Sequence, residues 1–279
     1  MQKFNEAELL SIKTNTDTET YWLSETFHEQ TKLNKTNIIQ FSNRIKKAFN
    51  DESFLKAAPL SFKNYNNVSK IALPNPKDLQ NLALAPLSEV IQNRRTCKNF
   101  RKNKQISKNQ LSYLLYYSYG ITHQIKDSRE NEHFFRSSPS AGGLFPCEIY
   151  ILINNVEKIN KGLYHYNVKE HQLECLYDGE LSTYIETLTT QGNILKDCSI
   201  VIFITAIFPR TLFKYGNRGY RFIHLDTGHL AQNLMLCSTA LGLASFPCGG
   251  YFDDRVNHLL GLDGVNETVV YELGVGISS

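Results

Sequence analysis

The stretch that decides the fold is FKYGNRGYRFIHLDTGHLAQNLMLCSTALGLASFPCGG, residues 213–250. It opens with a polar and basic run, continues as a long apolar pattern, and ends in a Pro-Cys-Gly-Gly turn. Leu230, Leu234, Cys237 and Leu241 recur at the spacing of one helical face, so this helix is expected to be central or buried at a subunit contact. Charged groups that lead directly into a buried helix are costly to desolvate without a partner, so a ligand is expected here.

Apolar segments outside this stretch predict a sheet. SIVIFITA, residues 199–206, is a continuous run rich in β-branched residues, which is typical of a central strand buried on both faces. GLYHYNV at 162–168 and HQLECLYDG at 171–179 predict a hairpin. No Gly-x-Gly-x-x-Gly follows a strand and opens a helix, which argues against a Rossmann domain. The irregular order of strands and helices predicts an α+β fold with a mixed sheet flanked by helices.

A further helix is predicted by ISKNQLSYLLYYSYG, residues 106–120. Ser107 and Gln110 have the spacing of a capping box, in which each side chain pairs with the other residue's backbone N–H. Gly120 stands where a residue in the left-handed conformation commonly ends a helix. The leucines and tyrosines between these signals are expected in the core.

The composition is that of an ordinary globular chain. Its 279 residues are 42% hydrophobic and 20% charged, which is enough to bury a sizeable core. The formal net charge of +3 is too small to indicate a nucleic-acid or membrane partner by itself. No apolar run is long enough for a secretory signal or a membrane span, so a cytoplasmic protein is expected.

No metal site is predicted. The six cysteines are irregularly spaced and include no Cys-x-x-Cys pair, so neither a zinc site nor a disulfide framework is indicated. His28 and Glu29 begin a His-Glu-x-x-His pattern, but Lys32 stands in place of the second histidine.

The first 85 residues differ in composition from the rest of the chain. They are rich in Asn, Lys, Thr and Ser, and Pro74 lies in a loop signal near their end. We therefore expect residues 1–85 to form an N-terminal extension, draped over the main domain or over a partner subunit, and residues 86–279 to form the main domain.

A basic segment follows the predicted helix LSEVIQNRR. It contains Arg94, Arg95, Thr96 and Lys98, and no acidic residue interrupts the basic residues that continue to Lys108. Such a run is either a solvated face or an anion site, since clustered guanidinium groups bind phosphate in a bidentate manner and a threonine hydroxyl can add a hydrogen bond.

A second candidate site is the loop RSSPSAGGLFPCE at 136–148, which leads directly into an apolar strand. Its centre consists of Pro139, Ser140, Ala141, Gly142 and Gly143. Because glycine adds no bulk above the backbone, a flat ligand can lie close against such a turn. A plain loop before a strand is an equally good interpretation of this segment taken alone.

Four segments together resemble the nitroreductase-like flavoprotein superfamily, and within it the SagB-type dehydrogenases, the azoline oxidases of thiazole- and oxazole-modified peptide biosynthesis. They are NRRTCKNF, PSAGGLFPCEIY with GLYHYN after it, the stretch from Lys214 to Gly250, and LLGLDG. The likeness runs from about Phe27 to Gly276, and the order and spacing of the segments carry its specificity.

The resemblance implies a homodimer that binds one FMN in each of two interfacial sites, with residues 86–279 as the FMN-binding domain. It assigns the phosphate and ribityl chain to Arg94, Arg95, Thr96 and Lys98. It places the loop 139–143 against the flavin ring from the partner subunit, and Gly249 and Gly250 near the reactive edge of the flavin. No metal is implied.

In the azoline oxidases a Lys-Tyr pair is the catalytic signature, and Lys214 and Tyr215 match it. The reaction takes a proton from the carbon derived from Cα and a hydride from the neighbouring ring carbon of the azoline. Either residue as the base requires a shifted pKa, because both ordinary values lie near 10. On a regular helix the two side chains are expected to point apart, so an irregular backbone near Gly216 and Gly219 is expected if both act.

Two other functions fit the same resemblance. An FMN-dependent nitroreductase or quinone reductase drawing hydride from NAD(P)H needs only the flavin site and an open cleft. A non-catalytic flavin-binding subunit, flavin-loaded or empty, could instead hold a cyclodehydratase partner together. For the azoline oxidase the expected partners are a heterocyclised peptide substrate, a second copy of the chain and a cyclodehydratase complex.

Overall fold

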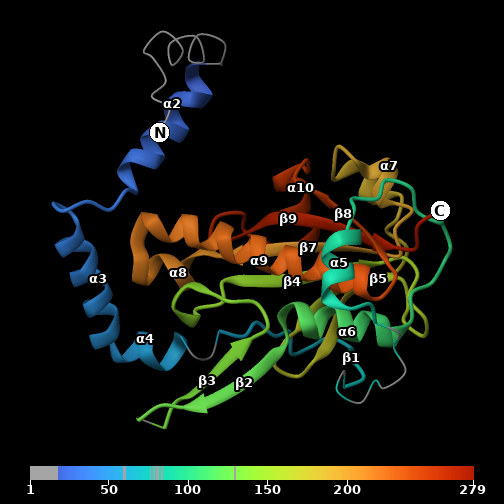
Figure 1. The fold of residues 1–279 in the computed structure, drawn as a ribbon, viewed down its shortest axis with the longest axis horizontal. Helices are drawn as coiled ribbons and strands as arrows, with labels where there is room; N and C mark the ends of the chain where they lie inside the picture. The colour runs from blue at the N-terminus through green and yellow to red at the C-terminus, as the bar shows by residue number, and fades with distance from the viewer. Residues whose placement is uncertain are drawn as a thin grey trace.

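The computed structural model describes residues 18–58, 61–75, 77, 79, 82, 84–128 and 130–279. Within them, seven strands form one sheet in the order β1-β6-β5-β4-β7-β9-β8, and two form a separate hairpin (Figure 1). The sheet strands are β1 (Lys70–Ala72), β4 (Cys147–Ile153), β5 (Gly162–Asn167), β6 (Gln172–Asp178), β7 (Ile200–Ile207), β8 (Ala244–Cys248) and β9 (Glu267–Gly276). The hairpin consists of β2 (Ile121–Lys126) and β3 (Glu132–Arg136).

Helices connect and cover these strands. They are α2 (Thr18–Gln30), α3 (Ile38–Asn50), α4 (Glu52–Ala57), α5 (Leu87–Asn93), α6 (Lys108–Tyr119), α7 (Gly192–Leu195), α8 (Phe208–Tyr215), α9 (Gly219–Ala240) and α10 (Asp253–Leu260). Three short 3₁₀ turns complete the described elements: η3 (Ala141–Gly143), η4 (Tyr184–Thr187) and η5 (Gly216–Arg218). The predicted α+β class and the hairpin of β5 and β6 are confirmed.

The direction of the strands differs from the prediction of a mixed sheet. Every ladder between named strands of the described residues is antiparallel. Parallel pairing is confined to isolated bridges, Thr96 with Ser245 and Ile106 with Val156. A continuous apolar run such as β7 reports burial on both faces, but it carries no information on the direction of its neighbours.

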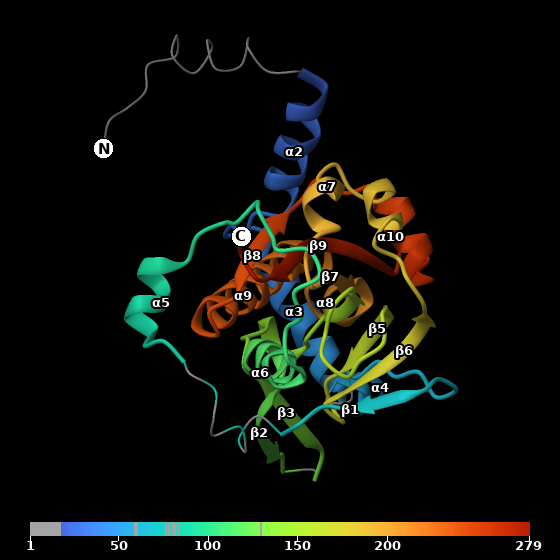
Figure 2. The same ribbon diagram turned by 90° about the vertical axis from the view of Figure 1, so that its right-hand side faces the viewer.

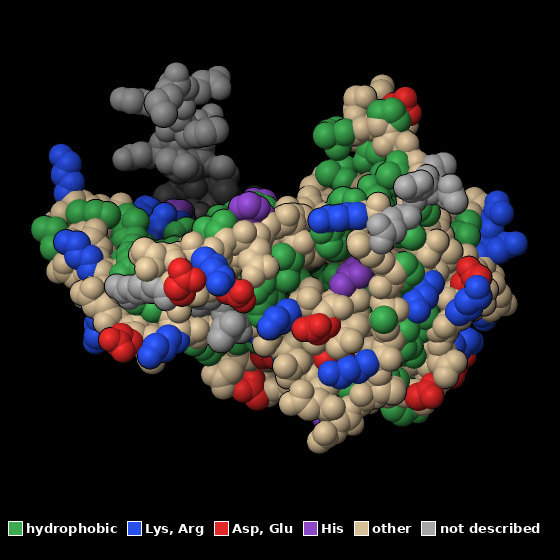
Figure 3. Space-filling view, turned by 90° about the horizontal axis from the view of Figure 1, so that it is seen from below, with side chains coloured by type: hydrophobic (Ala, Val, Ile, Leu, Met, Phe, Trp, Pro, Cys, Tyr) green, Lys and Arg blue, Asp and Glu red, His purple; other side chains and the backbone are tan. Residues whose placement is uncertain are grey.

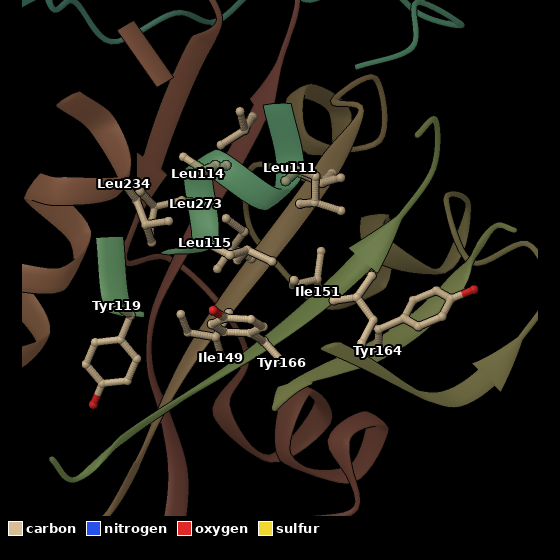
Figure 4. Close-up of a cluster of buried hydrophobic side chains, with 14 of the residues drawn as sticks. Leu111, Leu114, Leu115, Tyr119, Ile149, Ile151, Tyr164, Tyr166, Leu234 and Leu273 are labelled. Atoms are coloured by element: carbon tan, nitrogen blue, oxygen red, sulfur yellow. The ribbon is translucent and has the colours of Figure 1, made fainter. Parts of the chain in front are cut away.

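Successive residues of the central strands point into two different cores. Ile149, Ile151 and Ile202 face helices α6 and α9 on one side of the sheet (Figures 2 and 4). Tyr150 and Phe203 face the opposite core, which also contains residues of α7 and α10. With helices on both faces, β4 is buried along its whole length and β7 along all but its last residue, which gives the domain a helix–sheet–helix layering.

Helix α9 is central, as predicted. Its 22 residues bury Leu230 and Leu234 against α6 and the sheet, and Figure 4 shows Leu234 in the cluster formed with α6. Not all of the helix is covered within one chain, since Leu225 is 57% exposed. An exposed leucine beside exposed His224 and His229 leaves part of this helix available for a second chain.

Helix α6 begins as predicted and ends differently. Ser107 and Gln110 form the capping box, which is confirmed. Gly120 has φ −67 and ψ 162, so the prediction of a left-handed residue there is wrong. The reason is that β2 begins at the next residue, which takes the chain directly into an extended conformation.

The N-terminal segment is mainly helical from Thr18 to Ala57 and continues as irregular chain with the short strand β1, and its first 17 residues lie outside the described range. Figure 1 shows α2 projecting away from the body, whereas α3 and α4 lie along the edge formed by α8. Strand β1, which belongs to the same segment, pairs with β6 and so joins the main sheet. The boundary between extension and main domain at residue 85 stays a prediction.

Charges on the lower face of the described chain are mixed. Figure 3 shows Lys and Arg side chains interspersed with Asp and Glu, without one continuous basic surface. No helix among the described residues is both long enough and apolar enough to span a bilayer.

Candidate active site

Lys214 and Tyr215 are the last two residues of α8, and both lie against the N-terminal arm. Lys214 is 6% exposed, with Nζ 4.5 Å from the centre of the Phe49 ring. The Tyr215 ring stacks on Phe41 of α3 with centroids 6.3 Å apart. After Tyr215 the backbone leaves the helix at Gly216, where φ is +56, a value that favours glycine. The arm thus forms one wall of the environment around both side chains.

Both side chains converge on Gly142, in the Pro-Ser-Ala-Gly-Gly loop. A Cβ atom placed on Gly142 would meet the Tyr215 hydroxyl and would lie 2.8 Å from Lys214 Nζ. The expected separation of adjacent residues on a helix is overcome here, because the helix ends at Tyr215, whose φ of −110 departs from helical geometry. We call Lys214, Tyr215, Ser140, Gly142 and Asp226 the Lys-Tyr cluster.

Asp226 on α9 holds the loop in this position. Its carboxylate accepts a hydrogen bond of 2.5 Å from Ser140 Oγ and a longer one of 3.3 Å from the Ala141 N–H. Ser140 Oγ in turn accepts a hydrogen bond from the Phe145 N–H. The loop is therefore fixed to the central helix by a side chain for which the sequence offered only the weak signal of a polar residue on an apolar helix.

Burial shifts the pKa values of the cluster in different directions. Burial lowers the pKa of the Lys214 ammonium, because it has no carboxylate partner among the described residues. Burial, and secondarily the Asp226 charge, raises the pKa of the Tyr215 phenol. Burial also raises the pKa of Asp226, although hydrogen bonds from Ser140 and Ala141 oppose that shift. Of the pair, Lys214 is the group that loses its proton more readily than usual.

A buried network of charged side chains anchors α8, the helix that carries Lys214 and Tyr215. Arg210, one turn before Lys214, pairs with Glu148 at 2.5 Å and donates a hydrogen bond of 3.1 Å to the Phe145 carbonyl. His165 lies between Glu148 and Glu174, at 3.1 and 3.0 Å. Arg210 thereby connects α8 to the segment just after Gly143.

The pKa shifts within this network follow from its pairing. Burial opposes the charge of Glu148, yet Arg210 and His165 together lower the pKa of this carboxyl to about 2. Burial likewise opposes the charge of His165, yet the hydrogen bonds that it donates to Glu148 and Glu174 raise its pKa. These residues carry no joint signal in the sequence, because they come from separate strands and one helix that only the tertiary fold brings together.

The basic segment, which we define as Arg94, Arg95, Thr96 and Lys98, lies in a different setting. Thr96 pairs with Ser245 at the start of β8, and the Cys97 N–H donates to the Ser245 carbonyl. Arg95, Thr96 and Lys98 are exposed and Arg94 is half-buried. None of the three cations forms an ion pair with a described residue. The positive charge is therefore left available for an anion.

Gly249 and Gly250 follow the other end of β8. No heavy atom lies within 4 Å of a Cβ placed on Gly249, and the same is true of Gly143 in the loop. The Gly250 carbonyl accepts hydrogen bonds of 2.9 and 2.8 Å from the Thr189 and Thr190 hydroxyls. Hydrogen bonds thus fix this turn at Gly250, whereas the space beside Gly249 is open.

One chain does not bring all the predicted site residues together. The Lys-Tyr cluster contains Asp226 of α9, whereas the basic segment lies beyond the C-terminal end of the same helix at Ala240. Asp226 and Ala240 are about 21 Å apart along the helix axis, because an α-helix rises 1.5 Å per residue. Figure 1 shows α8, which ends in Lys214 and Tyr215, and α5, which precedes the basic segment, at opposite ends of α9. Among the described residues, no three His, Cys, Asp or Glu side chains gather closely enough to hold a metal ion.

Curated proteins similar to the chain include a protein of Methanocaldococcus jannaschii named as a nitroreductase, which is 29% identical over 68% of this chain and 89% of its own length. The trifolitoxin-processing protein TfxB of Rhizobium leguminosarum is 30% identical over 64% of this chain and 50% of its own. The microcin B17-processing protein McbC of Escherichia coli is 31% identical over 46% of this chain and 49% of its own. The chain thus spans about half the length of the two peptide-processing relatives.

Solved structures give the same result for the fold. A nitroreductase-like protein from Anabaena variabilis aligns with a TM-score of 0.68 at 27% identity, over 90% of this chain and 45% of that chain. A chain of the E. coli microcin synthetase McbBCD complex, solved with truncated pro-MccB17 bound, aligns with a TM-score of 0.57 at 21% identity, over 100% and 99%. The sequence profile described as "Nitroreductase family" matches residues 91–277. The predicted superfamily is therefore confirmed, and this chain belongs to the nitroreductase family.

Proposed function

We propose that this protein is an FMN-dependent dehydrogenase that oxidises thiazolines or oxazolines in a peptide to thiazoles or oxazoles. The observation that carries the proposal is the convergence of Lys214 Nζ and the Tyr215 hydroxyl on Gly142. A lysine of lowered pKa beside a neutral phenol is suited to removing a proton from carbon. The similarity to two proteins named for peptide processing supports the peptide substrate.

The residues present fit an FMN. In the proposal Arg94, Arg95, Thr96 and Lys98 hold the phosphate and ribityl chain, since these cations are accessible and unpaired among the described residues. The open space above Gly143 and Gly249 leaves room for a flat ring. When bound, FMN supplies a two-electron acceptor for the hydride that leaves the azoline ring.

In the proposed mechanism Lys214 is the base. Its neutral amine takes the proton from the carbon derived from Cα, and the resulting ammonium is held over Phe49. Tyr215 stays protonated, because its pKa is raised, and its hydroxyl donates a hydrogen bond that orients the substrate. Asp226 acts indirectly, since it fixes Ser140 and so the loop against which the substrate would lie.

We further propose a homodimer in which the Lys-Tyr cluster of one chain and the basic segment of the other serve the same flavin. Two observations support this: the separation of the groups along α9 in one chain, and the exposure of Leu225 on that helix. The alignment with a chain of a microcin synthetase complex makes a cyclodehydratase complex the proposed wider assembly.

The test is mass spectrometry of an azoline-containing peptide after incubation with the FMN-loaded protein. We expect a loss of about 2 Da per heterocycle, the mass of the two hydrogens removed. A protein that consumes NAD(P)H with a nitroaromatic or quinone acceptor but leaves the peptide mass unchanged is a nitroreductase or quinone reductase instead. A purified protein that takes up no FMN would support the non-catalytic scaffold.

A further inference from the structure

A basic cavity adjoins Tyr215. It has a volume of about 570 Å³ and lies between the α2–α3 connection and the junction of α8 with α9. Four of its lining residues are basic, namely Lys32, Arg44, Lys47 and Arg218, and none of the described lining residues is acidic, although Lys32 is ion-paired with Glu29 beside the cavity. A cavity of this charge attracts carboxylates or other anions.

The cavity touches the Lys-Tyr cluster at Tyr215. Tyr215 and Gly216 form part of its wall, so a ligand in the cavity would lie beside the Tyr215 ring. Phe41, which stacks on that ring, is a wall residue as well. A molecule whose reacting atoms lie near Lys214 could therefore extend a flanking segment into this space.

One face of α3 gives the cavity its length and its hydrogen-bonding groups. Asn37, just before the helix, and Gln40, Arg44 and Lys47 recur three or four residues apart and all line the cavity. This row extends about 15 Å, the length of four to five residues of extended peptide. Side-chain amides both donate and accept hydrogen bonds, which suits them to the backbone of such a peptide.

The opposite wall is held by specific hydrogen bonds. Arg218 Nη1 donates to the Thr31 carbonyl at 2.6 Å, and Arg221 Nε donates to the Thr31 hydroxyl at 2.8 Å. Arg44 Nη2 donates to the Leu212 carbonyl at 3.1 Å, which ties α3 to α8. Lys47, in contrast, forms no close ion pair with a described residue, although its charge contributes to the lowered pKa of Asp51, and its side chain lines the cavity.

We propose that this cavity binds an acidic segment of the peptide substrate, a few residues away from the ring that is oxidised. The inference rests on the proposed function, because it takes the Lys-Tyr cluster as the place of reaction. It adds a substrate class: peptides with Asp or Glu within about four residues of the azoline, the span of the row on α3. Lys47 makes the direct charge contact, whereas Arg44 and Arg218 also maintain the walls.

The experiment uses full-length, FMN-loaded protein and matched thiazoline peptides. One peptide carries two aspartates near the ring, on its N-terminal or its C-terminal side, and the control peptide carries asparagines in their place. Binding is measured by fluorescence anisotropy of the labelled peptides, and oxidation by the loss of mass. We expect the acidic peptide to bind about threefold to tenfold more tightly, with a difference that shrinks at high salt.

The decisive variant is Lys47→Gln, with Lys46→Gln as its control. Both lysines are exposed on α3, but only Lys47 lines the cavity. Lys47→Gln should remove most of the preference for the acidic peptide by raising KM without changing kcat, whereas Lys46→Gln should retain it. Equal binding of the two peptides, or equal effects of the two variants, would overturn the proposal.

The two proposals fail in different ways. Charge-dependent binding without loss of mass would retain the acidic-peptide site and reject the azoline oxidase. Oxidation of both peptides with the same KM would retain the oxidase and reject this site.

Discussion

The Lys-Tyr cluster and the basic segment are built in opposite ways. In the cluster, Lys214 and Asp226 are each 6% exposed, and the loop that they face is bonded to α9 through Ser140. In the basic segment, Arg95 and Lys98 are exposed and without ion pairs among the described residues. The chain thus preorganises the groups that would do chemistry and leaves those that would hold an anion open to solvent. The geometry of the cluster is therefore set by the fold, whereas the side chains of the basic segment are expected to become fixed only when an anion binds.

The largest expected effect lies in the cluster. Lys214→Ala should reduce azole formation by about 10²- to 10⁴-fold, the usual contribution of a general base, while FMN remains bound. Because burial lowers the pKa of Lys214, kcat should rise with pH and level off below the ordinary lysine value of 10.5. Initial rates across pH and the flavin absorbance check both statements. Tyr215→Phe is the control with a smaller loss, and a flat pH profile would contradict Lys214 as the base.

The second effect concerns the buried charged network of Glu148, Arg210 and His165. Glu148→Gln should lower the free energy of unfolding by about 3–5 kcal/mol, because it leaves Arg210 and His165 buried with only part of their partners. The folded-state pKa of Glu148, about 2, lies below the ordinary 4.5, so this stabilisation is fully present above about 4.5 and is lost as the pH falls toward about 2.

Urea unfolding at pH 7 and pH 3 measures this stabilisation. The control is Glu186→Gln, which removes a carboxylate that is 43% exposed and should cost less than about 1 kcal/mol. Equal losses for the two variants would show that burial of the network contributes no special stability.

The third effect lies in the basic segment. Arg94→Ala or Arg95→Ala should each weaken FMN binding by about 10- to 100-fold, as expected for a charge-assisted hydrogen bond worth about 1.5–3 kcal/mol. The thermal stability of the apoprotein should change little, because neither side chain makes an ion pair within the described residues and Arg95→Ala removes only two exposed hydrogen bonds, to the Gln92 and Arg94 carbonyls. Flavin fluorescence titration measures the affinity, with the exposed Arg101→Ala as the matched control. Full affinity in both arginine variants would remove this segment from the flavin site.

The smallest effect tests the contact between the loop and the Lys-Tyr pair. Gly142→Ala should lower kcat about tenfold, because the new methyl group meets Tyr215 and Lys214 and the residue has φ +66. Gly261→Ala is the control for backbone strain, since Gly261 has φ +68, no heavy atom within 4 Å of the added carbon and no place in the proposed flavin site. The two variants share the backbone strain, so a difference in kcat measures the contact. Identical rates would show that the pair does not depend on the loop.

Much of the fold could be predicted from the sequence because its strongest signals are local. The apolar run at 199–206 became β7, the helical period after Thr227 became part of α9, and the capping box at Ser107 formed as expected. The failures have equally local causes. The antiparallel direction of the strands was missed because it depends on connections between distant segments and not on the residues of each strand. The extended conformation of Gly120 was missed because β2 follows it immediately.

The sequence by itself determined the residue types of the candidate site: the basic segment, the glycine-rich loop and the Lys-Tyr pair. Only the tertiary structure decided which of them meet. It places Gly142 against Lys214 and Tyr215, recruits Asp226, Arg210 and Glu148 from separate elements, and keeps the basic segment apart in one chain. The physical reason is that spacing along the chain sets local geometry, whereas burial, pairing and pKa depend on neighbours that the packing of distant segments supplies.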